Sequence, residues 1–139
     1  MIVVDTGPLV AAALSNDERH HECVELFTQA HLARRKLLVP SPVVSEVCYL
    51  LERDGGSRVE ADFLRSMGDE DFALAELTSI DLRRMADLVD TYADLPLGGV
   101  DASVVTVAER LGVDEVATLD RRDFHVVRPS HTHALKLVP

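Results

Sequence analysis

The sequence predicts an α/β fold: one three-layer domain over residues 1–139, with a central, mostly parallel sheet flanked by helices. Short aliphatic and β-branched runs alternate with longer segments whose apolar residues recur at helical spacing. A length of 139 residues suits a single hydrophobic core. With 47% hydrophobic and 27% charged residues, the composition is typical of a folded globular protein.

The first half of the chain is expected to alternate two strands with three helices. Ser41 is expected to cap the third helix, with Pro42 at its first position. That helix carries Glu46 and is expected to stop at Gly55-Gly56. In order, the elements are a strand at 2–4, a helix from Pro8 after a turn at 6–8, a helix at 17–35, a strand at 37–39 and the helix from Ser41.

The second half continues the alternation. Thr78 to Asp81 resembles a capping box with Asp in the Glu position. Gly112 is expected to end a later helix. In order, the elements are a helix from the capping residue Ser57 to about 67, a strand at 72–77, a helix from the capping box to about 92, a loop at 95–99, a helix at 100–111, and strands at 116–119, 125–127 and 135–138.

Composition also limits the class of protein. The net charge of −10 argues against a protein that coats nucleic acid by charge alone, but it permits a nuclease whose acids are masked by cations. Cys23 and Cys48 are expected to be reduced core residues of a cytoplasmic protein, without a zinc site. The chain shows neither a signal peptide nor a run of about 18 apolar residues, so no membrane association is expected.

Four carboxylates from distant parts of the chain are predicted to meet at one edge of the sheet. Asp5 and Asp120 each end a predicted strand. Glu46 and Asp101 lie near the starts of helices at the same edge. In open parallel sheets, ligands bind outside the carboxyl ends of the strands. Three of the acids also have an ordinary explanation, Asp101 as a favourable helix-dipole position, Asp120 as an Asx turn and Glu46 as a surface charge, whereas Asp5 is the hardest to explain in this way.

Such a cluster needs a counter-charge. Two carboxylates about 4 Å apart repel by ~4 kcal/mol at an effective dielectric near 20. Either some are protonated or a hard cation lies among them. Oxygen ligands alone favour Mg²⁺ or Mn²⁺ over zinc, and such ions commonly bind substrate phosphates. The predicted chemistry is therefore attack on phosphorus by a metal-activated water, with one or two metal ions.

Neighbouring residues keep two interpretations each. Arg121 and Arg122 either steer an anionic strand toward the metal or face solvent. Asp123 is either a further ligand or a turn residue, and we favour the turn. Thr6 and Thr118 either hold carboxylates in place or are plain strand-end threonines. The six histidines are expected to be polar surface residues rather than metal ligands.

The sequence resembles the PIN-domain ribonucleases, and within them the VapC toxins of prokaryotic toxin–antitoxin pairs. The matching stretches are IVVDTGPLVA, PSPVVSEVCYLL, LPLGGVDASVVTVAERLG and VATLDRRDF, in the order typical of the family. The resemblance implies a metal-dependent endoribonuclease with Asp5 and Asp101 as the main metal ligands and Glu46 and Asp120 completing the pocket. It also implies a homodimer and a VapB-type antitoxin whose C-terminal segment blocks the site. Residues 53–78 carry no recognised motif.

Two other functions compete with the nuclease. A phosphatase of the haloacid-dehalogenase type also uses an Asp after its first strand, but it needs a second acid two residues on, where this chain has Gly7. A catalytically silent PIN module that only binds a partner is the second. Transfer, ribosomal and messenger RNA are all compatible with the nuclease.

Overall fold

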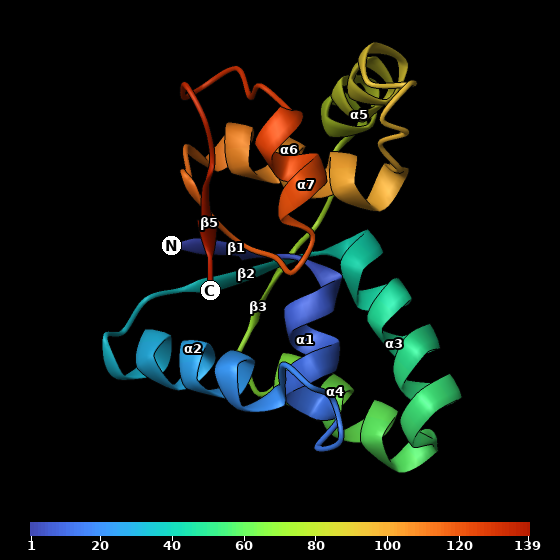
Figure 1. Cartoon of the computed structure of the whole chain (residues 1–139), viewed down its shortest axis with the longest axis vertical. Coiled ribbons are helices and arrows are strands. Elements are labelled where there is room, and N and C mark those ends of the chain that lie inside the picture. The colour runs from blue at the N-terminus through green and yellow to red at the C-terminus, as the bar shows by residue number, and fades with distance from the viewer.

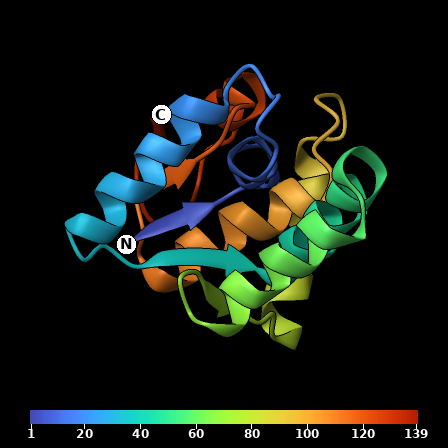
Figure 2. The same ribbon diagram turned by 90° about the horizontal axis from the view of Figure 1, so that it is seen from below.

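The computed structural model, which describes all 139 residues, has five parallel strands in the order β3-β2-β1-β4-β5. β1 (Ile2–Val4) is central, between β2 (Leu37–Pro40) and β4 (Glu115–Ala117); β3 (Ala73–Ala75) and β5 (Lys136–Val138) are the edges. Figure 2 shows β1 and β2 side by side and pointing the same way. The strand order reverses between β1 and β4. This reversal creates a topological switch point, where α/β folds commonly bind ligands.

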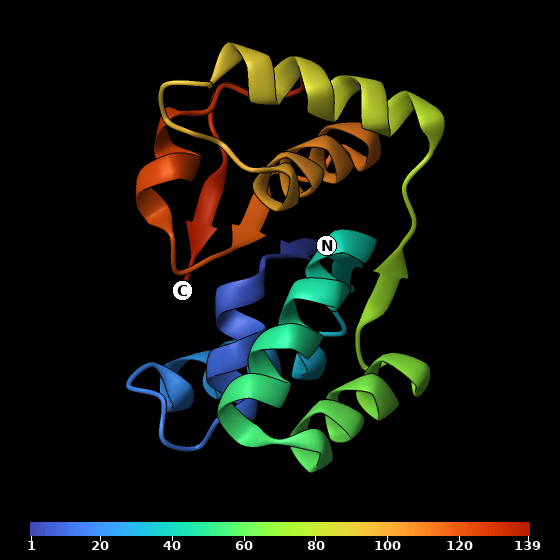
Figure 3. The ribbon, with the colours of Figure 1, turned by 90° about the vertical axis from the view of Figure 1, so that its right-hand side faces the viewer.

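Helices cover both faces of the sheet, which gives the three predicted layers (Figures 1 and 3). One layer holds α1 (Thr6–Ala13), α2 (His20–Leu32), α3 (Ser41–Gly55) and α4 (Ser57–Gly68). The other holds α5 (Ser79–Thr91), α6 (Gly99–Leu111) and α7 (Arg121–Val126). A sheet covered on both faces buries its strands completely, which explains why β1 and β2 are continuous apolar runs.

The core is a single cluster of 27 buried hydrophobic side chains extending from Ile2 to Leu135. It is mostly aliphatic, with Phe27, Phe63 and Phe124 as its buried aromatic residues. Fully buried Val3, Val4 and Val116 hold the switch point between the two helix layers. None of the seven helices has both the length and the hydrophobicity that crossing a membrane requires.

Several predicted boundaries are wrong for identifiable reasons. Thr6-Gly7-Pro8 is not a turn but the first turn of α1, a position where proline needs no amide hydrogen. α2 begins only at His20, because Asp17 accepts a hydrogen bond from the amide of Arg19 (2.8 Å) and forms a turn there. The same helix ends at Leu32, and Arg34 then adopts a left-handed φ of 55°.

Two predicted helix caps are also wrong, whereas the capping box is confirmed. Pro40 and Gly56 occupy the cap positions, and Ser41 and Ser57 are already helical. The Thr78 hydroxyl accepts from the amide of Asp81 (3.1 Å), whose carboxylate accepts from the amide of Thr78 (2.9 Å). Gly112 ends α6 in the left-handed region, as predicted.

Three predicted strands differ from the structure. The one predicted at 72–77 is limited to the three residues that pair with β2, and the one at 116–119 lies one to two residues earlier, as β4. The strand predicted at 125–127 is wrong. His125 and Val126 belong to α7 and Val127 is its C-cap, and Phe124 anchors this helix in the core. The strand at 135–138 is confirmed as β5.

Candidate active site

Asp5 is fixed at the centre of the carboxyl edge by the strand that precedes it. It follows β1 directly, and its amide donates to the carbonyl of Ala117 (2.9 Å), which continues the pairing of β1 with β4. Its side chain is only 6% exposed. A carboxylate at this position is therefore held in place by the two innermost strands.

Thr118 connects two of the acids. It follows β4 and is fully buried. Its hydroxyl donates to Asp5 Oδ2 (2.8 Å) and accepts from the amide of Asp120 (3.0 Å). Of the two interpretations of Thr118, the structure therefore favours the one in which its hydroxyl holds a carboxylate.

Glu46 and Asp101 approach the same place from two helices. α3 starts directly after β2 and carries Glu46 in its second turn. α6 starts after the Gly98 cap and carries Asp101 in its first turn, where the helix dipole favours a negative charge. Both side chains are half-buried.

A hollow of about 510 Å³ at the carboxyl edge brings all four predicted acids together. Its position is the switch point between β1 and β4. Gly7 lies in its wall, where a Cβ would come within 3.3 Å of Leu119 Cβ, so a larger residue would displace the loop that carries Asp120. The lining residues are Asp5, Thr6, Gly7, Glu46, Leu50, Asp101, Leu119 and Asp120.

Asp123 lies close to two of these acids, in a helix and not in the turn that was predicted. It lies in the first turn of α7, three residues after Asp120, the N-cap of that helix. Carboxylate oxygens of Asp101, Asp120 and Asp123 lie within 4.8 Å of one another. The three-residue spacing of Asp120 and Asp123 could have indicated that both belong to the site, because side chains three apart share one face of a helix.

The electrostatics of the hollow follow from burial and like charge. Burial, and then the charges of Asp5, Asp120, Asp123 and Glu46, raise the pKa of Asp101 to about 7. Burial also raises the pKa of Asp5, although hydrogen bonds from the Thr6 amide and the Thr118 hydroxyl oppose this rise. Burial and then Asp120 raise the pKa of Asp123. The site therefore disfavours its own negative charge unless a cation is present.

The donor set fits a hard divalent cation. Every titratable group that lines the hollow is a carboxylate, and no His or Cys is present. The buried hydroxyl of Thr6, also in the wall, has no hydrogen-bond partner. Oxygen ligands of this kind suit Mg²⁺, Mn²⁺ or Ca²⁺ rather than a softer metal.

The remaining candidates lie outside the hollow. Arg121 donates to the carbonyls of Leu137 and Pro139, which ties α7 to the end of β5, whereas Arg122 is exposed. His20, His31 and His131 bond backbone carbonyls, and no histidine lines the hollow. Cys23 and Cys48 are free, as predicted.

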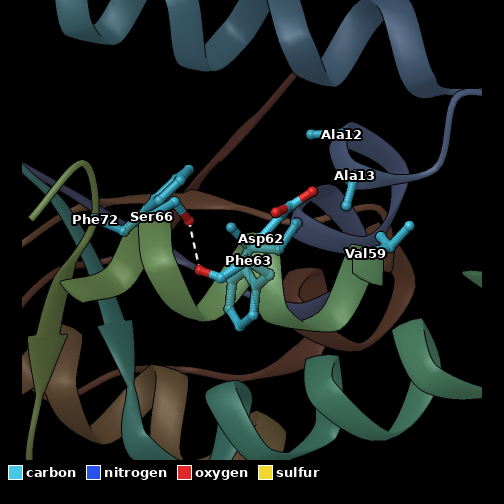
Figure 4. Close-up of a pocket in the computed structure, with 8 residues that line it drawn as sticks. Ala12, Ala13, Val59, Asp62, Phe63, Ser66 and Phe72 are labelled. Atoms are coloured by element: carbon cyan, nitrogen blue, oxygen red, sulfur yellow. Dashed lines mark hydrogen bonds between the residues drawn. The ribbon is translucent and has the colours of Figure 1, made fainter. Parts of the chain in front are cut away.

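A second hollow of about 280 Å³ lies between α1 and α4 (Figure 4). Six of its eight lining residues are hydrophobic. Its one acid, Asp62, pairs with Arg58 and Arg65, and its Ser66 hydroxyl donates to the carbonyl of Phe63 (2.6 Å). With its polar groups already paired, this hollow lacks the chemistry of the acidic one.

Comparison with known proteins gives one family. A model of the PIN domain matches residues 2–128. The ribonuclease VapC26 of Mycobacterium tuberculosis is 30% identical over 142 residues, which cover 99% of this chain and 100% of that protein.

Solved structures with the same fold include toxins and toxin–antitoxin complexes. VapC20 of Mycobacterium tuberculosis, a toxin that cleaves the sarcin–ricin loop, superposes with a TM-score of 0.74 at 19% identity, over 84% of this chain and 87% of that one. VapBC2 of Rickettsia felis, bound to a DNA fragment from its promoter, superposes with a TM-score of 0.68 at 15% identity, over 99% of this chain and 97% of that one. At these identities the likeness concerns the fold.

Proposed function

The chain belongs to the PIN-domain family, and on this premise we propose that it is a VapC-type endoribonuclease, the toxin of a toxin–antitoxin pair. The convergence of Asp5, Glu46, Asp101 and Asp120 on one hollow is the observation that carries the proposal. A ribonuclease that matches over the full length of the chain supports the same activity. Family membership also argues against the phosphatase of the haloacid-dehalogenase type.

Within this proposal the acids divide the work. Asp5 and Asp101 are the main metal ligands, and Glu46 and Asp120 complete the pocket. Asp123 is a further ligand candidate, because its carboxylate oxygen lies within 4.8 Å of those of Asp101 and Asp120. The Thr118 hydroxyl keeps Asp5 oriented and favours its ionised form, against the larger opposing effect of burial on its pKa. When bound, a Mg²⁺ or Mn²⁺ ion supplies positive charge that acidifies water and stabilises the charge developing on the phosphoryl group. In the metal-free site the pKa of Asp101 is about 7, and a cation bound there would lower it, because a positive charge favours the carboxylate.

The partners follow from the same assignment. RNA is the substrate, and a VapB-type antitoxin is the expected inhibitor, consistent with the VapBC2 complex among the structural neighbours. We place the protein in the cytoplasm, where it would bind both the RNA and the antitoxin. The homodimer stays a prediction, which analytical ultracentrifugation of the purified chain would test.

Asp5→Asn is the direct test of the activity. We expect this variant to lose cleavage of total RNA in Mg²⁺ or Mn²⁺ while its melting temperature stays equal or rises, because a buried like charge is removed. Asp90→Asn, an exposed change on α5, is the matched control and should cut like the wild type.

Two outcomes would overturn the assignment. Cleavage by Asp5→Asn at the wild-type rate would exclude the acidic hollow as the active site. A wild-type protein that binds neither Mg²⁺ nor Mn²⁺ in calorimetric titration at millimolar concentration, and cuts no RNA, would instead support a silent PIN module.

A further inference from the structure

Tyr49 is the one strongly exposed aromatic side chain of the protein. The chain has four Phe, two Tyr and no Trp. Its Phe residues and Tyr92 are buried or half-buried, whereas Tyr49 is 64% exposed. A singly exposed hydrophobic side chain is common on protein surfaces, so the role of Tyr49 has to be judged from its neighbours.

Tyr49 lies on the helix that carries two lining residues of the acidic hollow, Glu46 and Leu50. On α3, Val43, Val47 and Leu51 are fully buried and define the face that meets the core. Glu46 and Leu50, on the neighbouring face, line the hollow. Tyr49 is three residues from Glu46 and adjacent to Leu50, and residues three or four apart are neighbours on a helix surface. The ring therefore stands one turn along the helix from an acid of the site.

Arg53 adds a cation to the ring. Its guanidinium carbon lies 6.0 Å from the centroid of the Tyr49 ring, and its Nε donates to Asp54 (2.8 Å). Arg53 follows Tyr49 by one turn, so Glu46, Tyr49 and Arg53 form one stripe along α3. Tyrosine rings and guanidinium planes are the groups on which proteins stack unpaired bases.

We propose that Tyr49, supported by Arg53, stacks on an unpaired base of the RNA whose phosphate is held in the acidic hollow. This inference rests on the proposed nuclease function. It defines the substrate as a single strand, loop or bulge with at least one base free to leave its own stack. A continuous duplex offers no such base and should be a poor substrate.

The surroundings of Tyr49 favour a base over a protein partner. Tyr49 is the only large hydrophobic residue exposed on α3, and its exposed neighbours Ser45, Glu52 and Arg53 are polar. Protein interfaces need a contiguous, largely apolar core. An isolated ring among polar groups matches instead the sequence-tolerant stacking sites of single-strand binders.

A tryptophan at this position reports stacking directly. Because the chain has no Trp, Tyr49→Trp introduces a single tryptophan, whose fluorescence can be excited apart from that of Tyr92. In the Asp5→Asn background, which keeps RNA intact, we expect a short single-stranded RNA of mixed sequence to quench this fluorescence in Mg²⁺. Inorganic polyphosphate, which has no base, should not. Ile80→Trp, at a position 78% exposed on α5, is the matched control and should respond to neither.

Kinetics on the otherwise unmodified enzyme give a second measurement. We expect Tyr49→Ala to raise KM for single-stranded RNA about tenfold with kcat nearly unchanged, as for loss of one stacked base. Tyr49→Phe keeps the ring and should stay near the wild type. Because the ring is exposed, the melting temperature of each variant should not change.

The outcomes separate this inference from the function it rests on. If the wild type cuts RNA but Tyr49→Ala keeps its KM and RNA leaves the fluorescence of the Tyr49→Trp variant unchanged, stacking is excluded and the nuclease stands. If Tyr49→Ala instead changes the oligomeric state in sedimentation without changing KM, the ring belongs to a protein interface and stacking is again excluded. A wild type that neither binds nor cuts RNA removes both proposals.

Discussion

A single buried hydroxyl shows how finely the site is organised at the level of residues. Thr118 holds the side chain of Asp5 and the backbone of Asp120, two groups that β1 and the end of β4 bring from opposite ends of the chain. Its bond to Asp5 lowers the pKa of that acid against the larger effect of burial. Thr118 thereby favours the ionised form that a cation requires.

Asp101 makes the stability of the metal-free protein depend on pH. Its pKa is about 7 in the folded protein, against 3.8 for an unperturbed Asp, so between these values the folded state binds more protons than the unfolded state. The contribution of Asp101 to stability is therefore present at low pH and is lost as pH rises through about 7. Asp101→Asn should remove this loss and stabilise the protein at pH 8 by about 2 kcal/mol, after allowance for solvent screening.

Thermal unfolding in chelator at pH 5 and pH 8 tests this expectation. The gain from Asp101→Asn should shrink at pH 5, where the wild-type carboxyl is already neutral. Asp90→Asn, on exposed α5, should give the same small difference at both pH values. An Asp101→Asn gain that is no larger at pH 8 than at pH 5 would contradict the raised pKa.

At the scale of elements, the ends of strands and helices were predictable where a local physical signal was strong. The apolar run of β1 stops at Asp5, and Gly112 ends α6 in the left-handed region. The alternation of strands and helices sufficed to place Asp5, Glu46 and Asp101 at one edge, where the structure has them. No local sequence pattern predicts the order of the strands, and therefore none predicts the switch point.

α7 is the element that local signals failed to predict. His125-Val126-Val127 has the β-branched content of a strand, but six residues are too few to display helical periodicity. Tertiary packing decides instead, because Phe124 is fully buried and Arg121 bonds the end of β5. Because this helix was not predicted, the position of Asp120 and Asp123 on one face of it was not predicted either.

α5 offers a test of capping, since its box was predicted from sequence alone. Thr78→Ala should cost about 1 kcal/mol of unfolding free energy, as for a typical N-cap. Asp81 also accepts from Arg110 Nε (3.2 Å) and is only 3% exposed. Asp81→Ala should therefore cost about 2 kcal/mol, because it removes the cap and also one partner of Arg110, which is partly exposed and keeps its bond to the Glu76 carbonyl.

Urea unfolding of both variants measures the difference. The slope of free energy against urea should match the wild type if the change affects stability alone. RNA cleavage below the transition should be unchanged, since α5 contributes no side chain to the acidic hollow. Equal losses for the two variants would show that the bond from Arg110 contributes nothing.

At the scale of the whole molecule, the charge of −10 predicts how RNA binds. Two exposed arginines lie on helices that also carry acids of the site: Arg53 on α3, where it pairs with Asp54, and Arg122 on α7. About two phosphate contacts on a single strand give a slope of log affinity against log salt of roughly −1.4, whereas six would give about −4. Stacking on Tyr49 and a divalent cation in the hollow do not add to this slope.

Titration of Asp5→Asn with single-stranded RNA at several KCl concentrations and constant Mg²⁺ measures the slope. A shallow slope means that affinity comes mainly from the stacked base, so one local site selects the substrate. A slope near about −4 would mean that a basic surface dominates instead. The cluster Arg34-Arg35-Lys36 would then be the place to examine, although it lines a hollow at the amino end of β2, the edge opposite the acids.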